Sequence, residues 1–415
     1  MNFSYTPIAS ILHDRIARQA ILSLYADALA GIGGSLLEPE AVAGATGTTP
    51  LLYFVLTGGT EQDALALRAV RARQYPDEPV WIIAHPNQNS LPAALEMLAR
   101  VRRDGGSGRI FFLNGAADAQ GLDTLRRSIN AMSAMRSLAT ARLGRIGDSS
   151  DWLVASSHDP KTVRDGWGVT VVPVPIDMLH KYMADEGVPE TGPEFTFFSK
   201  AQSIREPSPT DIGKSVGVYR ALRRIVKEQR LDALTLRCFD LVLDEKTTGC
   251  FGLSRLNDEG IIAGCEGDIP AALALLWVKR LTGLTGWMSN PARIDAPAGR
   301  LLLAHCTVPC SIVSRYTIRS HFESSLGVGI SGEFELGPVT LVRIGGAQLD
   351  RLWTAEGTIV ATSGADGLCR TQIECDLPPA SLESIVRDPL GNHIVVVQGH
   401  CERDLVEAFD IRQHH

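Results

Sequence analysis

The chain has 415 residues, of which 45% are hydrophobic and 21% are charged, a length that predicts two or three domains rather than one core. Its net charge of −7 argues against a nucleic-acid-binding protein, and no apolar run approaches the roughly 20 residues that span a membrane. No secretory leader is recognised, and the eight cysteines have neither disulfide-framework nor zinc-knuckle spacing, so we expect a soluble, cytoplasmic protein with reduced thiols.

Residues 1–142 are predicted to form an α/β domain that begins with an amphipathic helix over residues 8–30. Continuous apolar strands then alternate with helices of about a dozen residues, which is typical of a doubly wound parallel sheet. The expected strands are 51–56, 80–84 and 109–113, and the expected helices are 62–74, 91–103 and 122–138.

A second α/β domain is predicted over residues 143–295. Its first strand is expected at 145–146, running into 148–154. The next, at 169–174, contains proline, which places it at a sheet edge or ends it early. After an irregular stretch at 185–209 and a strong helix at 214–229, residues 232–284 indicate strand, loop, helix, strand, turn and helix.

Two strands of this domain are followed by carboxylates. Asp240 follows the strand at 233–237, and Glu266 and Asp268 follow the strand at 261–264. Ligands bind at the carboxyl ends of parallel strands in open α/β sheets. Asp268 also stands where a helix begins, so a simple capping role is one interpretation. Two clustered acids exceed the need for a cap, which favours a metal or acid–base role.

The last region, residues 296–415, has frequent Gly and Pro and short strands, the pattern of an antiparallel barrel or sandwich. The expected strands are 300–305, 311–318, 339–344, 349–353, 357–363, 369–375 and 394–398. The predicted fold class is therefore two doubly wound α/β domains followed by a C-terminal antiparallel β-barrel-like domain.

Three histidines lie at strand ends in this region. His305 ends one strand, His393 precedes another, and His400 follows it. A lone histidine at such a place is more often structural. Several histidines together with a carboxylate cluster suit Mn, Co, Zn or Fe, so both interpretations stay open.

Several segments resemble the L-fucose isomerase and L-arabinose isomerase superfamily, the metal-dependent aldose–ketose isomerases. The segments that carry the resemblance run through most of the chain in the order of the family. They are 84–99, 145–156, LSRLNDEGIIAGCEGDIPAALALLWVKRLTG (253–283), LLLAHCTVPCSIV (301–313), SHFESSLGVGISGEFELGPVTLVRIGG (320–346) and GNHIVVVQGHCERDLVEAF (391–409).

The resemblance implies an active site between the second and third domains, often completed by a neighbouring subunit. It implies Mn²⁺, or another divalent ion such as Co²⁺, Mg²⁺ or Zn²⁺, a small-molecule sugar substrate, and a homo-oligomer such as a trimer or hexamer. No nucleic-acid or membrane partner is expected.

The fucose-isomerase pattern places metal ligands at Asp268 and His393. Its partner carboxylate falls near Cys250, which cannot do the same job, so Asp240 is the substitute candidate and Asp244 the next. In the arabinose-isomerase pattern, the turn glutamate matches Glu266 and a strand-end histidine matches His305. The second glutamate of that pattern has no clear counterpart.

The predicted function is metal-dependent aldose–ketose isomerisation through an enediolate that the cation stabilises. Asp240 is the expected proton shuttle and a possible ligand, with Asp268 as the second catalytic acid. A metal-dependent lyase or epimerase, and a non-catalytic sugar-binding or assembly protein, are the alternatives. Candidate substrate contacts are Arg237, His85, Asn89 and His400, with Glu402 as a weaker candidate. A structural ion pair is the alternative for Arg237, and surface or interface polarity is the alternative for His400 and Glu402.

Overall fold

The structure is a computed structural model that describes residues 2–12, 14–47 and 49–413. It divides into two compact units. The first comprises the chain up to Arg136 together with the C-terminal residues from Glu407 onward, and the second comprises Ser137–Val406. The division into three domains at 142/143 and 295/296 stays a prediction.

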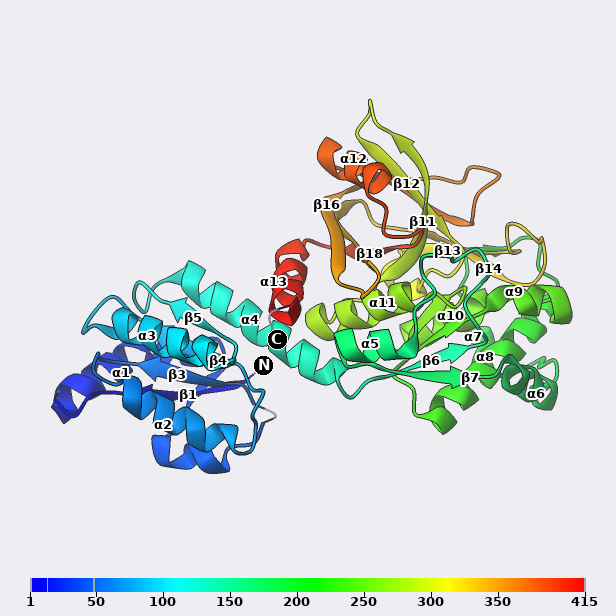
Figure 1. Cartoon of the computed structure of the whole chain (residues 1–415). Helices are drawn as coiled ribbons and strands as arrows, with labels where there is room; N and C mark the ends of the chain where they lie inside the picture. Colours follow the sequence, from blue (N-terminus) through cyan, green and yellow to red (C-terminus); the bar gives the residue numbers. More distant parts are fainter. Residues whose placement is uncertain (1, 13, 48, 414–415) are drawn as a thin grey trace. The chain divides into compact units, whose positions relative to one another are not determined.

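The first unit is built on a five-stranded parallel sheet with the order β2-β1-β3-β4-β5 (Figure 1). Its strands are β1 (Phe3–Ile8), β2 (Gly34–Leu36), β3 (Leu51–Val55), β4 (Val80–Ala84) and β5 (Gly108–Phe112). Its helices are α1 (Arg15–Gly31), η1 (Pro39–Gly44), α2 (Glu61–Ala72), α3 (Ser90–Arg103) and α4 (Ala119–Leu138).

Strand β1 was not expected from the sequence, which predicted a helix from residue 8. It pairs with β2 on one side and β3 on the other, so it is an interior strand that contains Pro7. Proline lacks the N–H that an interior strand normally donates, and this argues against a strand in a sequence pattern. The helix itself begins only at Arg15, after Asp14 caps it through a hydrogen bond from the Ala17 N–H.

The second unit contains a four-stranded parallel sheet with the order β10-β9-β6-β7. Its strands are β6 (Arg142–Ile146), β7 (Thr170–Val174), β9 (Ala233–Leu236) and β10 (Ile262–Cys265). The proline-containing strand β7 lies at the sheet edge, as predicted. Residues 148–154 form irregular structure and turns instead of continuing β6, and the Ser150 N–H bonds to the Glu266 carbonyl rather than to a neighbouring strand.

Helices and short segments complete this part of the unit. They are α5 (Pro160–Trp167), α6 (Ile176–Glu186), α7 (Phe195–Ser199), α8 (Pro209–Gln229), α9 (Cys238–Asp240), η2 (Leu241–Glu245), α10 (Cys250–Asp258) and α11 (Ile269–Thr282). A small separate sheet has the order β14-β13-β8 and consists of β8 (Ser203–Ile204), β13 (Arg315–Arg319) and β14 (Gly329–Glu333).

A closed antiparallel barrel with the strand order β11-β12-β17-β16-β15-β18 confirms the barrel-like fold predicted for the C-terminal region. Its strands are β11 (Trp287–Asp295), β12 (Arg300–His305), β15 (Gly337–Gly345), β16 (Arg351–Thr362), β17 (Thr371–Asp376) and β18 (Ile394–Gln398). The remaining elements are η3 (Cys310–Ile312), α12 (Pro379–Arg387) and α13 (Glu402–Gln413). Strand β16 replaces two predicted strands, and a register shift between Ile359 and Ala361 lets it stay continuous.

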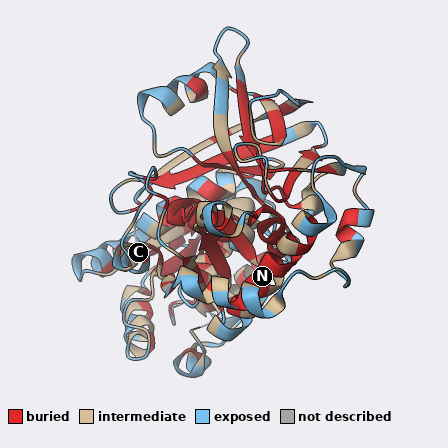
Figure 2. Cartoon of the chain, turned by 90° about the vertical axis from the view of Figure 1, so that its right-hand side faces the viewer, coloured by how far each residue is buried: buried red, intermediate tan, exposed pale blue. Residues whose placement is uncertain are grey.

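Helix α11 connects the sheet to the barrel within the second unit. It contacts β9 and β10 of the parallel sheet as well as β11, β15 and β18 of the barrel. Because the parallel sheet covers one side of α11 and the barrel covers the other, its sequence is apolar on almost every face. Trp277 of this helix is fully buried and packs against Trp167, with 5.3 Å between the ring centroids. Figure 2 shows the buried residues concentrated in strands and on helix faces.

In the described part of the chain, no helix combines the length and the apolar character that crossing a bilayer requires.

Candidate metal centre

The turn between β10 and α11 has an unusual backbone that positions two acids. Glu266 has a φ of +63° and Gly267 a φ of +72°, so two consecutive residues adopt the left-handed conformation. A side chain at Gly267 would meet the Asp148 carbonyl oxygen at 2.6 Å, so glycine is required there. A non-glycine residue in this region costs on the order of 1 kcal/mol and is typical of functional sites.

The Glu266 carboxylate is buried and held by partners from two other segments. The Trp152 indole N–H donates to Oε2 at 2.6 Å, and Oε1 lies 3.4 Å from His393 Nε2. Burial opposes ionisation, but His393, His305 and the indole hydrogen bond outweigh it and lower the pKa of Glu266 to about 2. Glu266 is therefore an ionised carboxylate with one oxygen directed at a histidine.

Asp268 begins α11 and has both of its oxygens engaged. Oδ1 accepts the Ala271 N–H at 2.7 Å, which confirms the helix cap, and Oδ2 accepts from His393 Nδ1 at 2.9 Å. The buried Arg343 guanidinium lies 3.2 Å from Oδ2 and also donates to Ser156 Oγ at 2.6 Å. Burial raises the pKa of Asp268, but Arg343 and His393 lower it by more, to well below its usual range.

His393 is fully buried just before β18 and stands between the two acids. Its Nδ1 faces Asp268, and its Nε2 has no hydrogen-bond partner among the described residues, although it faces Glu266. Burial lowers the pKa of His393, but the hydrogen bond to Asp268 and the charges of Asp268 and Glu266 prevail and raise it. A buried nitrogen without a hydrogen bond, beside an ionised carboxylate, fits a metal ligand.

His305, at the end of β12, completes the cluster. Its Nδ1 pairs with Thr307 Oγ1 at 2.8 Å, and its ring lies 5.7 Å from the His393 ring. Glu266, His305 and His393 each offer one potential ligand atom, a carboxylate oxygen or an imidazole nitrogen. These three atoms lie within 4.8 Å of one another. Burial and the neighbouring His393 lower the pKa of His305 to about 3, so the imidazole is neutral, as a metal ligand must be.

A cavity of about 480 Å³ opens beside this cluster. Glu266 and His305 line it together with Trp152, Phe239, Asn290, Pro291, His321, Glu323, Asn392 and five cysteines. The Trp152 and Phe239 rings meet edge to face at 4.9 Å in its wall. The parallel sheet, the barrel and the connection between β13 and β14 thus all contribute to one site within the second unit.

The structure does not bring Asp240 to this cluster. Asp240 Oδ1 accepts from Arg237 Nε at 2.9 Å. Asp240 lines a different cleft, next to Arg145 and Asp148, whereas its neighbour Phe239 lines the cavity beside the cluster. Arg237 also contacts Asp151, so it belongs to an ion-pair network with two acids, and its contact with substrate stays a prediction. Of Asp240, Asp268 and His393, the structure brings only the last two into contact.

Asp244 and Cys250, the other positions linked to the partner carboxylate, also lie outside the cluster. Asp244 is exposed on η2, and Cys250 is buried in the cavity wall at the start of α10. In the described part of the chain, the group of residues able to hold a metal ion consists of Glu266, His305 and His393, and neither Asp244 nor Cys250 belongs to it.

The remaining predicted substrate contacts have local partners. His85, in the first unit, is buried, with Nε2 bonded to the Leu56 carbonyl and Nδ1 accepting the Asn87 N–H, and Asn89 is exposed in a left-handed turn. His400 is half-exposed and pairs with Glu356 at 3.2 Å, and the Glu402 backbone N–H also bonds to Glu356. None of these residues lines the cavity beside the cluster.

The sequence reasoning assigned no role to several residues of the site. Trp152, His321, Glu323 and Arg343 all lie in segments that carried the family resemblance. Arg343 offered the clearest clue, because an arginine stands within the apolar run of β15 and a buried arginine needs an acidic partner.

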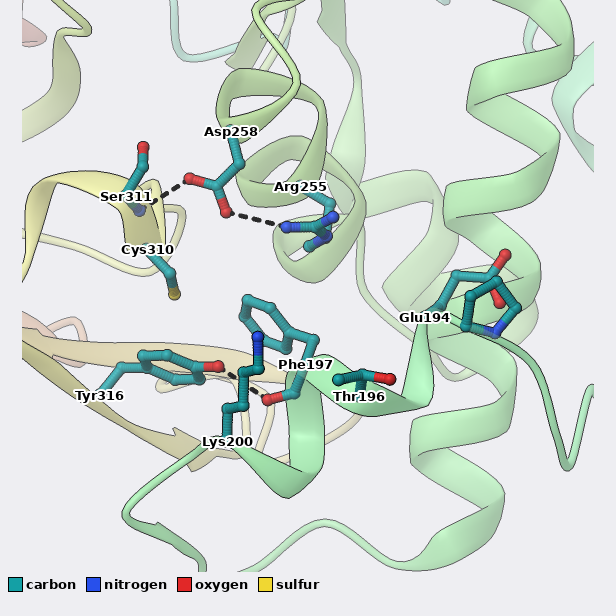
Figure 3. Close-up of a pocket in the computed structure, with 10 residues that line it drawn as sticks. Glu194, Thr196, Phe197, Lys200, Arg255, Asp258, Cys310, Ser311 and Tyr316 are labelled. Carbon is teal, nitrogen blue, oxygen red and sulfur yellow. Dashed lines mark hydrogen bonds and ion pairs between the residues drawn. The ribbon is translucent and has the colours of Figure 1, made fainter.

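A second cavity, of about 490 Å³, is shown in Figure 3. Asp258 accepts from the Ser311 N–H at 2.8 Å and from Arg255 at 3.2 Å, and the Tyr316 hydroxyl donates to the Phe197 carbonyl at 2.7 Å. These polar groups satisfy one another, and no grouping suited to a metal was found among the described residues there. The cavity beside Glu266, His305 and His393 is therefore the candidate functional site.

The chain is similar to curated proteins named sulfoquinovose isomerase. Identity is 23% over 280 residues with the protein from Alkalicoccus urumqiensis, covering 64% of this chain and 62% of that protein. With the protein from Priestia aryabhattai it is 22% over 248 residues, covering 56% and 54%, and with that from Clostridium sp. (strain MSTE9) it is 30% over 125 residues, covering 30% and 26%. The chain thus spans less than two thirds of the length of these relatives. No protein-family model matches it.

Proposed function

We propose that the chain is a divalent-metal-dependent aldose–ketose isomerase that acts on a small sugar or sugar derivative. The observation that carries the proposal is the buried group of Glu266, His305 and His393 beside a cavity of sugar-accommodating size. The similarity to proteins named sulfoquinovose isomerase supports the same reaction class. The homo-oligomeric state stays a prediction.

The donor set fits a cation of the Mn²⁺ type. One carboxylate and two imidazoles suit Mn²⁺, Co²⁺ or Zn²⁺ better than Mg²⁺, which prefers oxygen ligands. Glu266, His305 and His393 would hold it. Bound there, a divalent cation would polarise adjacent sugar oxygens and stabilise the negative charge that develops when a C–H proton leaves.

Residues around the ligands keep them in place. His393 donates through Nδ1 to Asp268, and this hydrogen bond directs the His393 Nε2 toward Glu266. The Trp152 indole N–H donates to the other carboxylate oxygen of Glu266, Oε2. Asp268 is itself fixed by the N-terminus of α11 and by Arg343. In this proposal Asp268 is a positioning residue rather than a ligand, because both of its oxygens already have partners.

Isomerisation also needs a group that moves a proton between neighbouring carbons. Asp240 faces another cleft, so the proposal gives this task to a titratable side chain in the cavity, His321 or Glu323. Burial and the nearby Arg370 lower the pKa of His321, which leaves its imidazole neutral and able to accept a proton. His321 Nδ1 pairs with Ser324 at 3.1 Å, which limits the rotation of the ring.

The lining also bears on the orientation of the sugar. Among its described residues there is no Lys or Arg, whereas Asn290, Asn392 and Glu323 offer hydrogen-bonding groups. This lining suits the reacting end of an aldose, which carries the C1 carbonyl and the C2 hydroxyl. A sulfonate, which the relatives' name indicates for their substrate, would lie away from this part of the cavity.

The experiment that tests the proposal is product analysis with metal-depleted and Mn²⁺-reloaded protein. A panel of aldoses, with and without a 6-sulfonate or 6-phosphate, is incubated in deuterated water and examined by NMR. We expect a ketose, with deuterium at C1 or C2, only in the reloaded samples. Chain cleavage would indicate a lyase and inversion at C2 alone an epimerase, while sugar binding without turnover would favour a non-catalytic binding protein.

A further inference from the structure

Sulfur is concentrated in the wall of the cavity. Of the eight cysteines, five line it, and all eight are free thiols. The five are Cys238, Cys250, Cys265, Cys306 and Cys369. The only grouping suited to a metal in the described part of the chain is Glu266 with the two histidines, so the thiols do not form a metal site of their own.

Two of these thiols are in direct contact. Cys265 is the last residue of β10, and Cys238 follows the neighbouring strand β9, two residues after the β9 partner of Cys265. Their Sγ atoms lie 3.0 Å apart, and both side chains are buried except where they face the cavity. A disulfide needs an S–S distance of about 2.05 Å, so a movement of about 1 Å would join them.

We propose that Cys238 and Cys265 form a reversible oxidative modification site that reports on peroxide and controls the metal centre. The Cys238 thiolate attacks a peroxide oxygen, the O–O bond breaks, and a sulfenic acid forms as hydroxide leaves and takes up a proton to become water. The second thiol attacks that sulfur, forming the S–S bond and releasing water. In total two thiols lose two electrons and two protons, and hydrogen peroxide is reduced to two molecules of water.

The modification would act on the metal site through the backbone. Cys265 directly precedes Glu266, whose left-handed conformation and two side-chain contacts set the direction of its carboxylate. Drawing Cys265 toward Cys238 would pull on this turn and misplace Glu266. This consequence rests on the proposed function, whereas formation of the bond does not.

Tryptic mapping can identify the bond without ambiguity. Cleavage after Arg237 and Lys246 isolates Cys238 in one peptide, and cleavage after Arg255 and Lys279 isolates Cys265 in another. The full chain is treated with hydrogen peroxide, alkylated and digested without reduction. We expect peptides 238–246 and 256–279 to be joined, and dithiothreitol to separate them.

Activity and Mn²⁺ binding are then compared before and after peroxide, each variant relative to its own untreated sample. We expect wild-type protein to lose at least about tenfold in Mn²⁺ affinity and to recover with dithiothreitol. Cys238→Ser should be resistant, while Cys401→Ser, which alters a thiol outside this cavity, should behave like wild type.

The proposal is overturned if peroxide oxidises other thiols while these two peptides stay separate. It is equally overturned if peptide 301–315, with Cys306 and Cys310, joins peptide 352–370, with Cys369, and the 238–265 bond does not form. If the bond forms in a protein with no isomerase activity, the modification site stands and the proposed function fails.

Discussion

The neighbouring strands β9 and β10 are both followed by acidic residues, but these acids take different positions in the structure. Both strands are short, buried and followed by acidic residues. After β10, a left-handed turn directs Glu266 and Asp268 toward His393. After β9, the chain turns into α9, and Asp240 pairs with Arg237 in another cleft. The direction of the backbone after the strand, rather than the presence of a carboxylate, therefore decides which acid enters the site.

The largest expected effect is the difference in Mn²⁺ affinity and turnover between a substitution at Glu266, after β10, and one at Asp240, after β9. Glu266→Gln should lower Mn²⁺ affinity and turnover by more than about 100-fold, because loss of a direct ligand exceeds the 10–100-fold cost of losing a residue that only supports one. Asp240→Asn removes the same charge from the neighbouring strand end and should change both by less than about threefold. Calorimetric Mn²⁺ titration and initial rates provide the measurement, and equal effects of the two substitutions would contradict the comparison.

Asp268→Asn is expected to affect both folding and metal binding. The substitution leaves Arg343 buried without its charged partner, so unfolding free energy should fall by about 3–5 kcal/mol. Because Asp268 positions His393 without binding the cation, Mn²⁺ affinity should fall by about 10–100-fold and be retained in part. Urea unfolding and metal titration measure the two effects, and complete loss of metal from folded protein would show that Asp268 is a ligand.

The metal-free protein should lose stability as the medium becomes more acidic. In the unfolded chain, His305 takes up a proton near pH 6.5, whereas burial and His393 hold its folded pKa near 3. Unfolding between these values therefore binds a proton, and stability falls as pH drops through this window, by up to about 1.4 kcal/mol per unit. Glu266, with a folded pKa of about 2, adds to the loss below its usual value of 4.5.

His393 gives the opposite dependence. Its raised pKa contributes stability that is complete below pH 6.5 and is lost as pH rises through the folded value. Urea unfolding in the presence of a chelator, from pH 4 to 8, measures both trends. His305→Asn should flatten the acidic side of the profile, and a profile parallel to wild type would show that His305 is not a buried neutral imidazole.

The smallest expected effect is on stability at the β9 end. The Asp240 and Arg237 side chains are about one quarter exposed, and Arg237 keeps a second partner in Asp151. Asp240→Asn should therefore lower unfolding free energy by less than about 1 kcal/mol. A loss comparable to that of Asp268→Asn would mean that the two turns are equally important for folding.

Much of the fold follows from local patterns in the sequence. Strands β12 and β18 were predicted at their observed bounds, because apolar runs are delimited there by turn residues. Strand β11 was missed because it contains Asn290, Pro291 and charged residues, and it is held in place by pairing with β12 and β18. Such long-range pairing leaves no local pattern.

The site was predictable in composition but not in its detailed arrangement. The residues after β10 and the histidines at His305 and His393 were identified from strand ends and from the family resemblance. The exclusion of Asp240 depends on which way α9 turns, and the presence of His321 depends on a loop between β13 and β14 that has no periodicity. Neither feature is specified by residue spacing.

The central claim is that Glu266, His305 and His393 bind one cation. Anomalous diffraction from crystals grown with Mn²⁺ tests this most directly. The account predicts a single strong peak within about 2.0–2.3 Å of one oxygen of Glu266 and one nitrogen of each histidine. A peak beside Asp240, or no peak near His393 at saturating Mn²⁺, would contradict it.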